Sequence, residues 1–420
     1  MNALVFGAGK SGAAAAELLR RVGGRAAARP SREEGVVVRV LDGDDVYPDG
    51  AWDLAVTSPG VPIDHPWQVA ARAAGVPVIS ELELGARHFA GKMLAVTGSK
   101  GKSSVVKLVA DGLNAAGVTA VACGNYGTPL CDVALTEPQP EWAVVEVSSF
   151  QLETTNLPPG TFEAAAILNL QEDHLDRHGS VEVYHALKRR LLSMARPEHA
   201  SDMTIFEGHR ILESVCKDGP DELYDGSYFD NPVLSRNALA AIDLLSAAGV
   251  DEKTIRRAFL DFKPLPHRMQ TVAEMNGVRY IDDSKATSIA ALAAGVRMVP
   301  MPGLFRPARN VRLIAGGLAK GDNPKIAVPV LTTRVKKVYL IGRCADQFFD
   351  AWRETVPCEI CGTLGRAVEM SRRDACAGEV VLLSPGTASF DQFNSYGARG
   401  DAFASFVRAE ERGGGAESKK

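Results

Sequence analysis

The sequence predicts an α/β protein built from three domains. Its short apolar runs alternate with Ala- and Leu-rich helical stretches, the order expected of strands joined by covering helices. The runs are apolar throughout and flanked by glycines, as is typical of buried parallel strands. With 420 residues, the chain is long enough for two or three domains that each bury a core. The predicted strands cover residues 3–7, 54–58, 93–98, 142–147, 165–170, 311–317, 337–342 and 380–386.

Glycine turns and a proline-rich stretch mark the predicted domain boundaries. A strand runs into a Gly-containing turn followed by a helix at residues 7–9, 98–102 and 316–317. Residues 261–270 are Pro-rich and follow the helical stretch 251–260, so we predict a linker there. The predicted domains are residues 1–91, 92–265 and 266–410, and the low-complexity tail 411–420 is expected to be disordered.

Composition and charge indicate a soluble cytoplasmic protein. Hydrophobic residues make up 46% of the chain, and the formal net charge of -4 gives no support for a nucleic-acid or membrane surface. The seven cysteines are scattered, which suits a reducing compartment, and Cys358 and Cys361 are predicted to be buried thiols beside a strand. The N-terminus does not resemble a signal peptide, and no run of about 18 apolar residues predicts a membrane span.

Residues 95–105, AVTGSKGKSSV, carry a candidate phosphate loop. The segment joins a predicted strand to a helical run, and Gly98 and Gly101 permit the close backbone approach that phosphate oxygens require. Lys102 would supply positive charge, and one of the two serines after it would offer a hydroxyl to Mg²⁺. The first glycine lies three rather than five residues before the Gly-Lys pair, so the usual spacing is not met. From spacing alone, an ordinary strand-to-helix turn is an equal alternative.

Acidic residues and a histidine follow two further predicted strands. Glu146 ends an apolar strand, where a carboxylate is costly unless it is paired or bound to a metal, so we predict a metal ligand there. A salt-bridged glutamate is the alternative. The stretch EDHLDRH at 172–178 suits Mg²⁺ or Mn²⁺ better than zinc, because several carboxylates accompany the histidine. A polar loop that caps a helix would look similar.

Other polar stretches carry weaker signals. The stretch LKRRLL at 187–192 is expected to be a solvated helix face. Lys188 is expected to be a surface lysine, and periodicity gives no reason to single it out. In the third predicted domain, polar loops follow the strand VRYI and the strands 311–317 and 380–386. Because carboxyl ends of parallel strands share one sheet edge, these loops are expected to converge on one polar ligand.

The first strand leads into GAGKSG at residues 7–12, which matches the G-x-G-x-x-G pattern. A dinucleotide site also needs an acidic residue about 20 residues further on, after a second strand. Residues 23–32, GGRAAARPSR, offer arginines and no acid. We therefore predict a cradle for a nucleotide diphosphate rather than an NAD site.

Taken together, the motifs and their order resemble the Mur ligase family along nearly the whole chain. The most specific blocks are EVSSFQLE (146–153), EDHLDRHGS (172–180), HRMQTV with NGVRYIDDSKATS (267–288) and LLSPGTASFDQF (382–393). The loop TGSKGKSS (97–104) then corresponds to the phosphate loop of that family. The resemblance implies a Rossmann-like first domain, a central P-loop ATPase-like domain with a mostly parallel sheet, and a Rossmann-like third domain.

The resemblance also implies a reaction. It is the ATP-dependent addition of D-glutamate to UDP-N-acetylmuramoyl-L-alanine, a step in the synthesis of peptidoglycan precursors. ATP phosphorylates the substrate carboxylate to an acyl phosphate, and the glutamate amine then displaces phosphate, so catalysis is mostly alignment and charge stabilisation. We expect ATP with two Mg²⁺ sites, with Mn²⁺ as the alternative metal, and a monomeric cytoplasmic enzyme acting on small molecules.

By the same resemblance, roles fall on particular residues of this sequence. Catalytic residues would be Lys102, Lys188, His267 and Lys285. ATP would be bound by Gly98, Ser99, Lys100, Gly101, Lys102, Ser103, Ser104, Asn237, Arg268 and Asp283. Metal would be held by Ser103, Glu146, His174 and a carbamylated Lys188. The UDP-substrate would contact Gly9, Lys10, Ser11, Ser58, Gly60 and Asn125, and the incoming glutamate would contact Thr287, Lys320, Ser389 and Tyr396.

The sequence departs from the family pattern at several of these places. Lys100 and Asp282 each stand where Asn is usual, Ser104 replaces Thr, and Tyr396 replaces Phe. Leu234 stands at the first Asn of an H-N-x-x-N pair whose second Asn remains.

Three alternatives stay open on the sequence. One is the same chemistry with L-glutamate or another acceptor. Another, motivated by Lys100 and Leu234, is a nucleotide-binding regulator without catalysis. The third, an NAD-dependent dehydrogenase, rests on the glycine pattern of the first turn.

Overall fold

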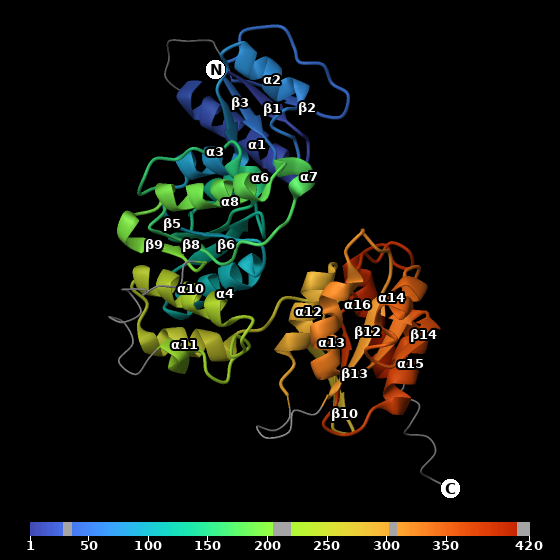
Figure 1. The fold of residues 1–420 in the computed structure, drawn as a ribbon. Helices are drawn as coiled ribbons and strands as arrows, with labels where there is room; N and C mark the ends of the chain where they lie inside the picture. The colour runs from blue at the N-terminus through green and yellow to red at the C-terminus, as the bar shows by residue number, and fades with distance from the viewer. Residues whose placement is uncertain (28–35, 205–219, 302–308, 410–420) are drawn as a thin grey trace. The chain divides into compact units, whose positions relative to one another are not determined.

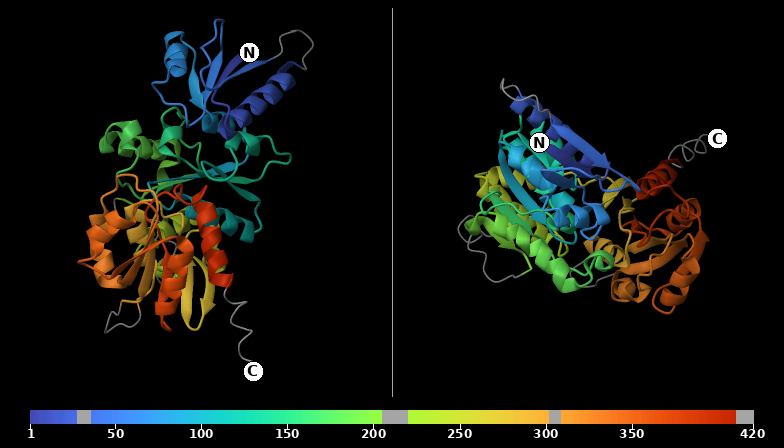
Figure 2. Two further views of the ribbon diagram at one scale, coloured as in Figure 1. Left: turned by 90° about the vertical axis from the view of Figure 1, so that its right-hand side faces the viewer. Right: turned by 90° about the horizontal axis from the view of Figure 1, so that it is seen from above.

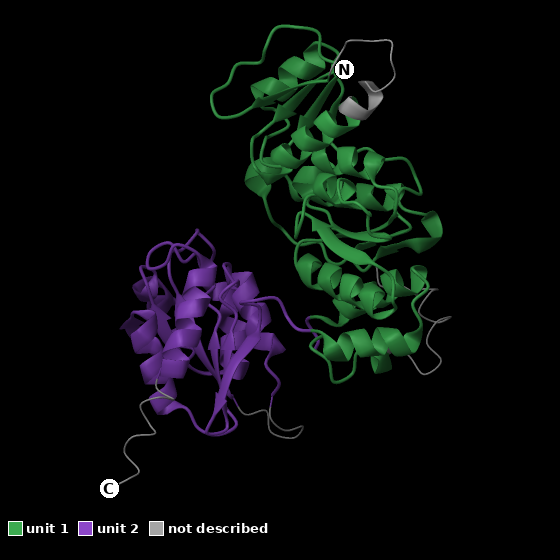
Figure 3. Ribbon diagram, turned by 180° about the vertical axis from the view of Figure 1, so that it is seen from behind, with its two compact units in different colours: residues 1–230, 234–262 green, residues 231–233, 263–420 purple. Residues whose placement is uncertain are grey.

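The computed structural model describes residues 1–27, 36–204, 220–301 and 309–409 (Figure 1). The predicted disordered tail 411–420 and Cys216 lie outside these ranges. The described chain forms two compact units (Figure 3). Unit 1 comprises residues 1–230 and 234–262, and unit 2 comprises residues 231–233 and 263–420. Unit 1 contains two sheets and unit 2 contains one, and the finer division into three domains stays a prediction.

The first sheet of unit 1 has the strand order β2-β1-β3-β4 among the described residues, with every neighbouring pair parallel. Its strands are β1 (Asn2–Phe6), β2 (Val37–Leu41), β3 (Leu54–Thr57) and β4 (Val78–Ser80). The helices between them are α1 (Lys10–Ala27), α2 (Pro66–Ala73) and α3 (Glu81–His88). The buried run Ala3 to Phe6 shows why β1 lies inside the sheet.

The second sheet of unit 1 has the order β6-β7-β5-β8-β9 and is also parallel. Its strands are β5 (Lys92–Thr97), β6 (Ala120–Gly124), β7 (Trp142–Glu146), β8 (Ala164–Ile167) and β9 (Ala200–Asp202). Short helices follow the strands: α5 (Leu130–Ala134), α6 (Ser149–Leu152), α7 (Leu175–His178) and α8 (Val181–Arg189). The 3-10 turns Arg190–Met194 and Pro197–His199 lead into β9, and a further one covers Pro220–Leu223.

Helix α4 (Lys102–Ala115) is covered by two helices from much later in the chain. These are α10 (Ser235–Ala247) and α11 (Glu252–Asp261), and both pack on α4. A Cβ at Gly112 would lie 2.9 Å from Leu245 Cδ2, so the glycine lets α4 and α10 approach closely. The predicted helix 251–260 is confirmed as α11, whose ends are shifted by one residue from the prediction.

One apolar core joins the two sheets of unit 1. It includes Val5 and Val56 from the first sheet and Ala95 and Val145 from the second. Helices α1, α3 and α5 pack on one another between these layers. The first two sheets therefore share buried apolar surface.

Unit 2, coloured from yellow-orange to red in Figure 2, contains in its described part a sheet with the order β10-β11-β15-β12-β13-β14, parallel except for β10. The strands are β10 (Gln270–Met275), β11 (Val278–Asp282), β12 (Val311–Gly316), β13 (Val335–Ile341), β14 (Cys358–Gly362) and β15 (Val380–Leu383). The helical elements are α12 (Ile289–Met298), the 3-10 turn Pro324–Ala327, α13 (Val328–Arg334), α14 (Ala345–Trp352), α15 (Leu364–Asp374) and α16 (Tyr396–Ala409).

Alternate residues of β15 enter separate cores on the two faces of this sheet. Val380 and Leu382 belong to a core with α12, α13 and α14, whereas Val381 and Leu383 pack with α15 and α16. A parallel strand buried on both faces reads as a continuous apolar run, which is why the sequence predicts it well.

The predicted α/β class and all eight predicted strands are confirmed, with small shifts at their ends. Strands β2, β4, β6, β9, β10 and β14 were not predicted, because they are short or partly exposed and lack a clear apolar run. Cys358 and Cys361 lie on β14 and are half-buried rather than fully buried. Within the described ranges, no helix has the length and apolar character to cross a membrane.

Candidate active site

The candidate phosphate loop joins β5 to α4 and has the backbone that its glycines allow. Gly98 has φ 144° and Gly101 has φ 89°, both in a region that side chains other than glycine rarely adopt. A Cβ on Gly101 would lie 2.2 Å from Asn237 Nδ2, so glycine is needed for space as well. This contact brings the predicted ATP-binding residue Asn237, buried on α10, against the loop.

Lys102 curls back over the loop. Its Nζ donates hydrogen bonds to Gly98 O at 2.8 Å and Ser99 O at 3.3 Å. Ser103 and Ser104 follow in the first turn of α4 and are buried. A lysine, a helix N-terminus and hydroxyls thus gather at one turn, which is an anion-binding arrangement.

Glu146 lies beside the start of this loop. The register of β5 and β7 pairs Val96 with Glu146, so the carboxylate ends the strand next to β5. Asn125 Nδ2 donates to Glu146 Oε1 at 2.6 Å. The second oxygen, Oε2, is buried without a hydrogen-bond partner, which is costly and fits a site for a cation.

The metal prediction has one further test. Among residues of described placement, no group of three or more His, Cys, Asp and Glu side chains is arranged to hold a metal. The donor set at the loop is completed only if groups of other kinds contribute, such as a serine hydroxyl, phosphate oxygens or a modified lysine. The unpartnered Glu146 oxygen is the observation that fits Mg²⁺ here.

On the other side of β5, the segment after β8 holds the loop in place. Ser99 N donates to Asn169 O at 2.9 Å. Lys100 N donates to Asn169 Oδ1, and Asn169 Nδ2 donates to Lys100 O, both at 2.9 Å. The Asn169 side chain therefore pairs with the backbone N–H and C=O of Lys100, as a neighbouring strand would. Its position in the sequence does not reveal this role.

Lys100, which departs from the family pattern, has a specific partner. Its Nζ lies 3.0 Å from Asp173 Oδ2. Partial burial acts to raise the pKa of Asp173, but the pairing with Lys100 and the hydrogen bond from His174 N lower it on balance. The ion pair ties the phosphate loop to the predicted metal-binding segment 172–178.

His174 is held in a strained backbone conformation just before α7. Its φ of 55° is uncommon for a residue other than glycine. The half-exposed imidazole packs on Phe150, with ring centroids 4.9 Å apart. His174 follows the segment after β8, and its role as a metal ligand stays a prediction.

Lys188 is buried rather than exposed, so its prediction as a surface lysine was wrong. Its Nζ donates to Gly98 O at 3.0 Å and lies 4.7 Å from the centre of the Tyr184 ring. Burial, with a smaller contribution from Lys102, lowers its pKa from 10.5 to about 7. The helix α8 turns this one lysine of LKRRLL inward, while Arg189 stays exposed.

The turn after β1 forms as predicted. Gly7 has φ 89°, and a Cβ on Gly12 would lie 1.8 Å from Gly7 O. Ser58 Oγ donates to Gly7 O at 3.3 Å. This hydrogen bond joins the loops after β1 and β3, which both carry residues predicted to bind the UDP-substrate. Gly9, Lys10 and Gly60 are exposed and Ser11 is half-buried.

An acidic residue does follow the second strand, contrary to the sequence prediction. Strand β2 begins only at Val37, and Asp42 comes directly after it. Asp42 Oδ1 accepts a hydrogen bond from Ala8 N at 3.3 Å, inside the glycine turn. The search of residues 23–32 missed it because α1 extends to Ala27 and the strand starts later than expected.

Unit 2 gathers a second set of predicted residues at the end of β11. His267 Nδ1 lies 2.7 Å from Asp282 Oδ2, so the departure from Asn at 282 supplies a carboxylate partner for the imidazole. Asp283 Oδ2 accepts from Ser384 Oγ at 2.8 Å. Burial raises the pKa of Asp283 to about 7, opposed by that hydrogen bond and by the charge of Arg268.

The predicted glutamate residues lie around the same loops. Lys285 Nζ is 3.9 Å from the centre of the Tyr396 ring, a cation–π contact. Ser389 is buried, and Thr287 is half-buried beside the start of α12. Lys320 is exposed in the turn after β12.

Arg399 is a residue that the sequence prediction missed. It is buried on α16 and donates to Ser284 Oγ, Ser284 O, Thr387 O and Ala388 O at 2.9 to 3.3 Å. Burial lowers its pKa to about 10. Its guanidinium ties the loop after β11 to the loop after β15, and nothing in the stretch YGARG signals this.

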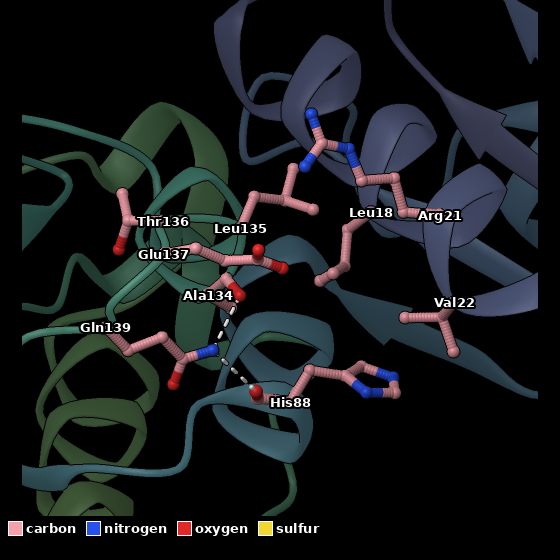
Figure 4. A pocket seen from close by; sticks show the side chains of 9 residues that line it. All are labelled: Leu18, Arg21, Val22, His88, Ala134, Leu135, Thr136, Glu137 and Gln139. Atoms are coloured by element: carbon pink, nitrogen blue, oxygen red, sulfur yellow. Dashed lines mark hydrogen bonds between the residues drawn. The ribbon is translucent and has the colours of Figure 1, made fainter. Parts of the chain in front are cut away.

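A pocket of about 260 Å³ in unit 1 lies away from these residues (Figure 4). Leu18 and Arg21 from α1, His88, and the segment after α5 line it. None of the predicted site residues lines this pocket, so it plays no part in the candidate site.

Comparisons with known proteins define the class. Residues 96–206 match the family model described as the Mur ligase middle domain. A UDP-N-acetylmuramoylalanine--D-glutamate ligase of Acidobacterium capsulatum is 35% identical, covering 97% of this chain and 96% of the relative. The protein of the same name from Frankia casuarinae is 37% identical, covering 97% and 94%. The chain therefore belongs to the Mur ligase family.

The fold agrees with solved structures of this family. The crystal structure of the UDP-N-acetylmuramate-alanine ligase of Thermotoga maritima aligns with a TM-score of 0.58 at 16% identity, covering 98% of this chain and 100% of that one. At this identity the likeness concerns the fold alone.

Replacing Arg399 tests its role in unit 2. Arg399→Lys keeps the charge but loses the planar fork, leaving several buried carbonyls without donors, so we expect a loss of about 2–4 kcal/mol in the free energy of unfolding. Urea unfolding measures it. The control is Arg408→Lys on the same helix, where the exposed guanidinium donates to Val272 O at 3.2 Å, and a loss under about 0.5 kcal/mol is expected. Equal losses in both variants would contradict the assignment.

The buried Lys188 predicts a specific dependence of stability on pH. Between pH 7 and 10.5 the folded lysine is largely neutral and the unfolded one is charged, so the unfolded state binds more protons and stability rises with pH. We expect wild type to gain up to about 1.4 kcal/mol per pH unit over Lys188→Met in this window. Urea unfolding in carbon-dioxide-free buffer at pH 7, 8 and 9 measures the difference. A difference that does not change with pH rules out a neutral buried lysine.

Proposed function

We propose that this chain is an ATP-dependent ligase that adds D-glutamate to UDP-N-acetylmuramoyl-L-alanine through an acyl phosphate, in the synthesis of peptidoglycan precursors. The observation that carries the proposal is the end-to-end similarity to relatives that bear the name of this activity. The geometry of the phosphate loop and its neighbours supports the ATP-dependent part. The enzyme acts in the cytoplasm as a monomer.

The phosphate loop and α4 bind the ATP phosphates. Gly98 to Ser104 supply backbone N–H groups, and Lys102 swings from its loop carbonyls to the phosphate oxygens. Asn237 and Arg268 contribute further ATP contacts. Leu234 replaces the first asparagine of the H-N-x-x-N pair of the family, so the adenine contact of that asparagine is missing. A Mur ligase of Thermotoga maritima similar in fold was solved in complex with ADP, with a TM-score of 0.56 at 16% identity.

Ser103, Glu146, His174 and Lys188 hold Mg²⁺ at two sites. Glu146 Oε2 is the oxygen in need of a partner, and a hydroxyl from Ser103 suits the same hard cation. Mg²⁺ held by these residues would supply positive charge that offsets the negative charge of the ATP phosphates. Manganese, which prefers similar oxygen ligands, substitutes for it.

Lys188 becomes a ligand by carbamylation. The neutral amine attacks the carbon of CO₂, a C–N bond forms as one C–O π bond breaks, and one proton leaves to water, so that a neutral amine becomes an anionic carbamate. A pKa of about 7 makes the neutral amine available near pH 7, whereas an ordinary lysine is protonated there. Lys100 and Lys102 contribute positive charge near Lys188, which favours the carbamate.

The loops of unit 2 receive glutamate. Lys285 offers a cation to a carboxylate, and Tyr396 covers it through the cation–π contact. Thr287, Ser389 and Lys320 complete the acceptor site, and Asp283 stands at its edge. The turn Gly9 to Ser11, with Ser58, Gly60 and Asn125, binds the UDP-substrate.

The sequence leaves three alternative functions open. L-glutamate as acceptor requires only a different placement of the same carboxylate-binding groups. A regulator that binds nucleotide without catalysis is favoured only by Lys100 and Leu234, and Lys100 has a structural partner in Asp173. An NAD-dependent dehydrogenase now meets the acidic-residue criterion through Asp42, but the family assignment argues against it.

Purified protein with UDP-N-acetylmuramoyl-L-alanine, MgATP and D-glutamate is expected to release phosphate and form the amide. With L-glutamate we expect kcat/KM at least about 100-fold lower, because a mirror-image acceptor presents its amine wrongly for attack. Phosphate release and mass spectrometry measure both. Faster reaction with L-glutamate would assign the chain to that acceptor, and no release with either enantiomer would remove the ligase function.

Lys188→Ala tests the carbamate. We expect activity to fall by at least about 100-fold, since a charged ligand and its alignment of phosphates are lost. Added formate or acetate should restore part of the rate by supplying a carboxylate in the vacated space. Lys188→Arg, which keeps a cation but forms no carbamate, is the control, and it should be inactive and without rescue. An unaffected rate in Lys188→Ala removes the lysine from the mechanism.

A further inference from the structure

His267 and Asp282 form a close pair in unit 2, and the resemblance that lists His267 as catalytic does not say what chemistry it performs. His267 lies in the loop before β10 with φ 59°, and Asp282 ends β11. Asp282 Oδ2 lies 2.7 Å from His267 Nδ1, while Oδ1 accepts from Ser284 N at 2.8 Å. The side chains are 2% and 15% exposed for Asp282 and His267, respectively. The carboxylate is thus buried and fixed, and the imidazole reaches a more open edge.

This arrangement fixes the tautomer of the imidazole. An ionised carboxylate only accepts hydrogen bonds, so Nδ1 must carry the hydrogen toward Asp282. In the neutral ring, Nε2 then holds the lone pair and is the basic nitrogen. Burial raises the pKa of Asp282, but the hydrogen bonds from His267 and Ser284 oppose that change and favour the ionised form.

Helix α16 is shaped to admit the pair. A Cβ at Gly400 would lie 2.1 Å from His267 Nδ1 and 2.4 Å from Asp282 Oδ2. At Gly397, three residues earlier on the same face, a Cβ would lie 3.7 Å from His267 Nε2. A glycine inside a helix costs stability, but at position 400 it provides the room that the pair needs, whereas the distance at Gly397 is an ordinary van der Waals contact.

The groups that face His267 come from several elements. Its ring centroid is 6.2 Å from that of Tyr396, and Lys285 Nζ lies over Tyr396 at 3.9 Å. Lys285 N also donates to His267 O at 3.0 Å. Across the ring, Nε2 lies 3.9 Å from Asp401 Oδ1, an exposed carboxylate on α16. The adjacent loop adds Arg268, and Gln270 Oε1 accepts from His267 N.

The proposed reaction needs a base at this place. An amino acid carries an ammonium group at neutral pH, and an ammonium has no lone pair for attack on an acyl phosphate. We propose that His267 Nε2, with Asp282 as its positioning residue, accepts the proton of the incoming ammonium. This inference rests on the proposed function, which assigns Lys285 and Tyr396 to the glutamate site.

The step balances as follows. One N–H bond of the ammonium breaks, the proton joins Nε2, and the pair becomes imidazolium and carboxylate. The freed amine attacks the acyl carbon, a C–N bond forms, and the C–O bond to phosphate breaks with its electron pair on phosphate. A second amine proton goes to the departing phosphate, and the imidazolium returns its proton to water.

The experiment separates amine attack from acyl-phosphate formation. Wild type, His267→Gln, Asp282→Asn and the control Asp401→Asn are assayed from pH 5.5 to 9 with glutamate. In parallel, hydroxylamine replaces glutamate, because it is neutral at pH 7, needs no base to expose its lone pair, and traps the acyl phosphate as a hydroxamate. Asp401→Asn makes the same change in charge near the other ring nitrogen.

The proposal expects a distinct pattern. His267→Gln lowers kcat/KM for glutamate by about 100-fold or more but changes hydroxamate formation by less than about 3-fold. In Asp282→Asn the acid limb of the glutamate profile moves to lower pH, because the carboxylate that stabilises the imidazolium is gone. Asp401→Asn keeps the wild-type profile.

Other results overturn the proposal. An acid limb unmoved in Asp282→Asn, or hydroxamate formation that falls as far as amide formation in His267→Gln, gives the pair a structural role only. The absence of hydroxamate in wild type would instead remove the acyl phosphate, and with it both the proposed function and this inference.

Discussion

The carbonyl of Gly98 is the point on which the candidate site depends. It accepts hydrogen bonds from Lys102 at 2.8 Å and Lys188 at 3.0 Å, so residues from α4 and α8 meet at one oxygen. Only a glycine backbone with φ 144° presents that oxygen to both. Burial is the main cause of the low pKa of Lys188, and the positive charge of Lys102 at the same carbonyl lowers it further.

Two departures from the family pattern acquire partners in the structure. Lys100 pairs with Asp173, and Asp282 pairs with His267. In each case a charged residue stands where the family has a neutral asparagine, and its partner side chain lies within 3.0 Å. Both substituted residues therefore make specific contacts that hold the two loops in place. Such contacts would not be expected if a catalytic site were being lost.

Much of the fold and part of the site could be predicted from the sequence. Buried strands such as β15 announce themselves by continuous apolar residues, and Glu146 stands out because a carboxylate at the end of such a strand needs a partner. Lys188 could not be found from local pattern, because its burial depends on where α8 packs. Asp42 and Arg399 were missed for similar reasons: one follows a strand that begins late, and the other acts through backbone carbonyls of distant loops.

The packing of α4 has a consequence for how the chain folds during synthesis. Helix α4, residues 102–115, follows the phosphate loop. The helices that pack on it, α10 and α11, come much later in the chain, and α11 ends at residue 261. Until that segment leaves the ribosome, an apolar helix face and the loop beside it stay open to water. A nascent chain of about 200 residues thus has the strands of the second sheet but lacks the covering helices α10 and α11. At this stage of synthesis, chaperone binding or premature association matters most.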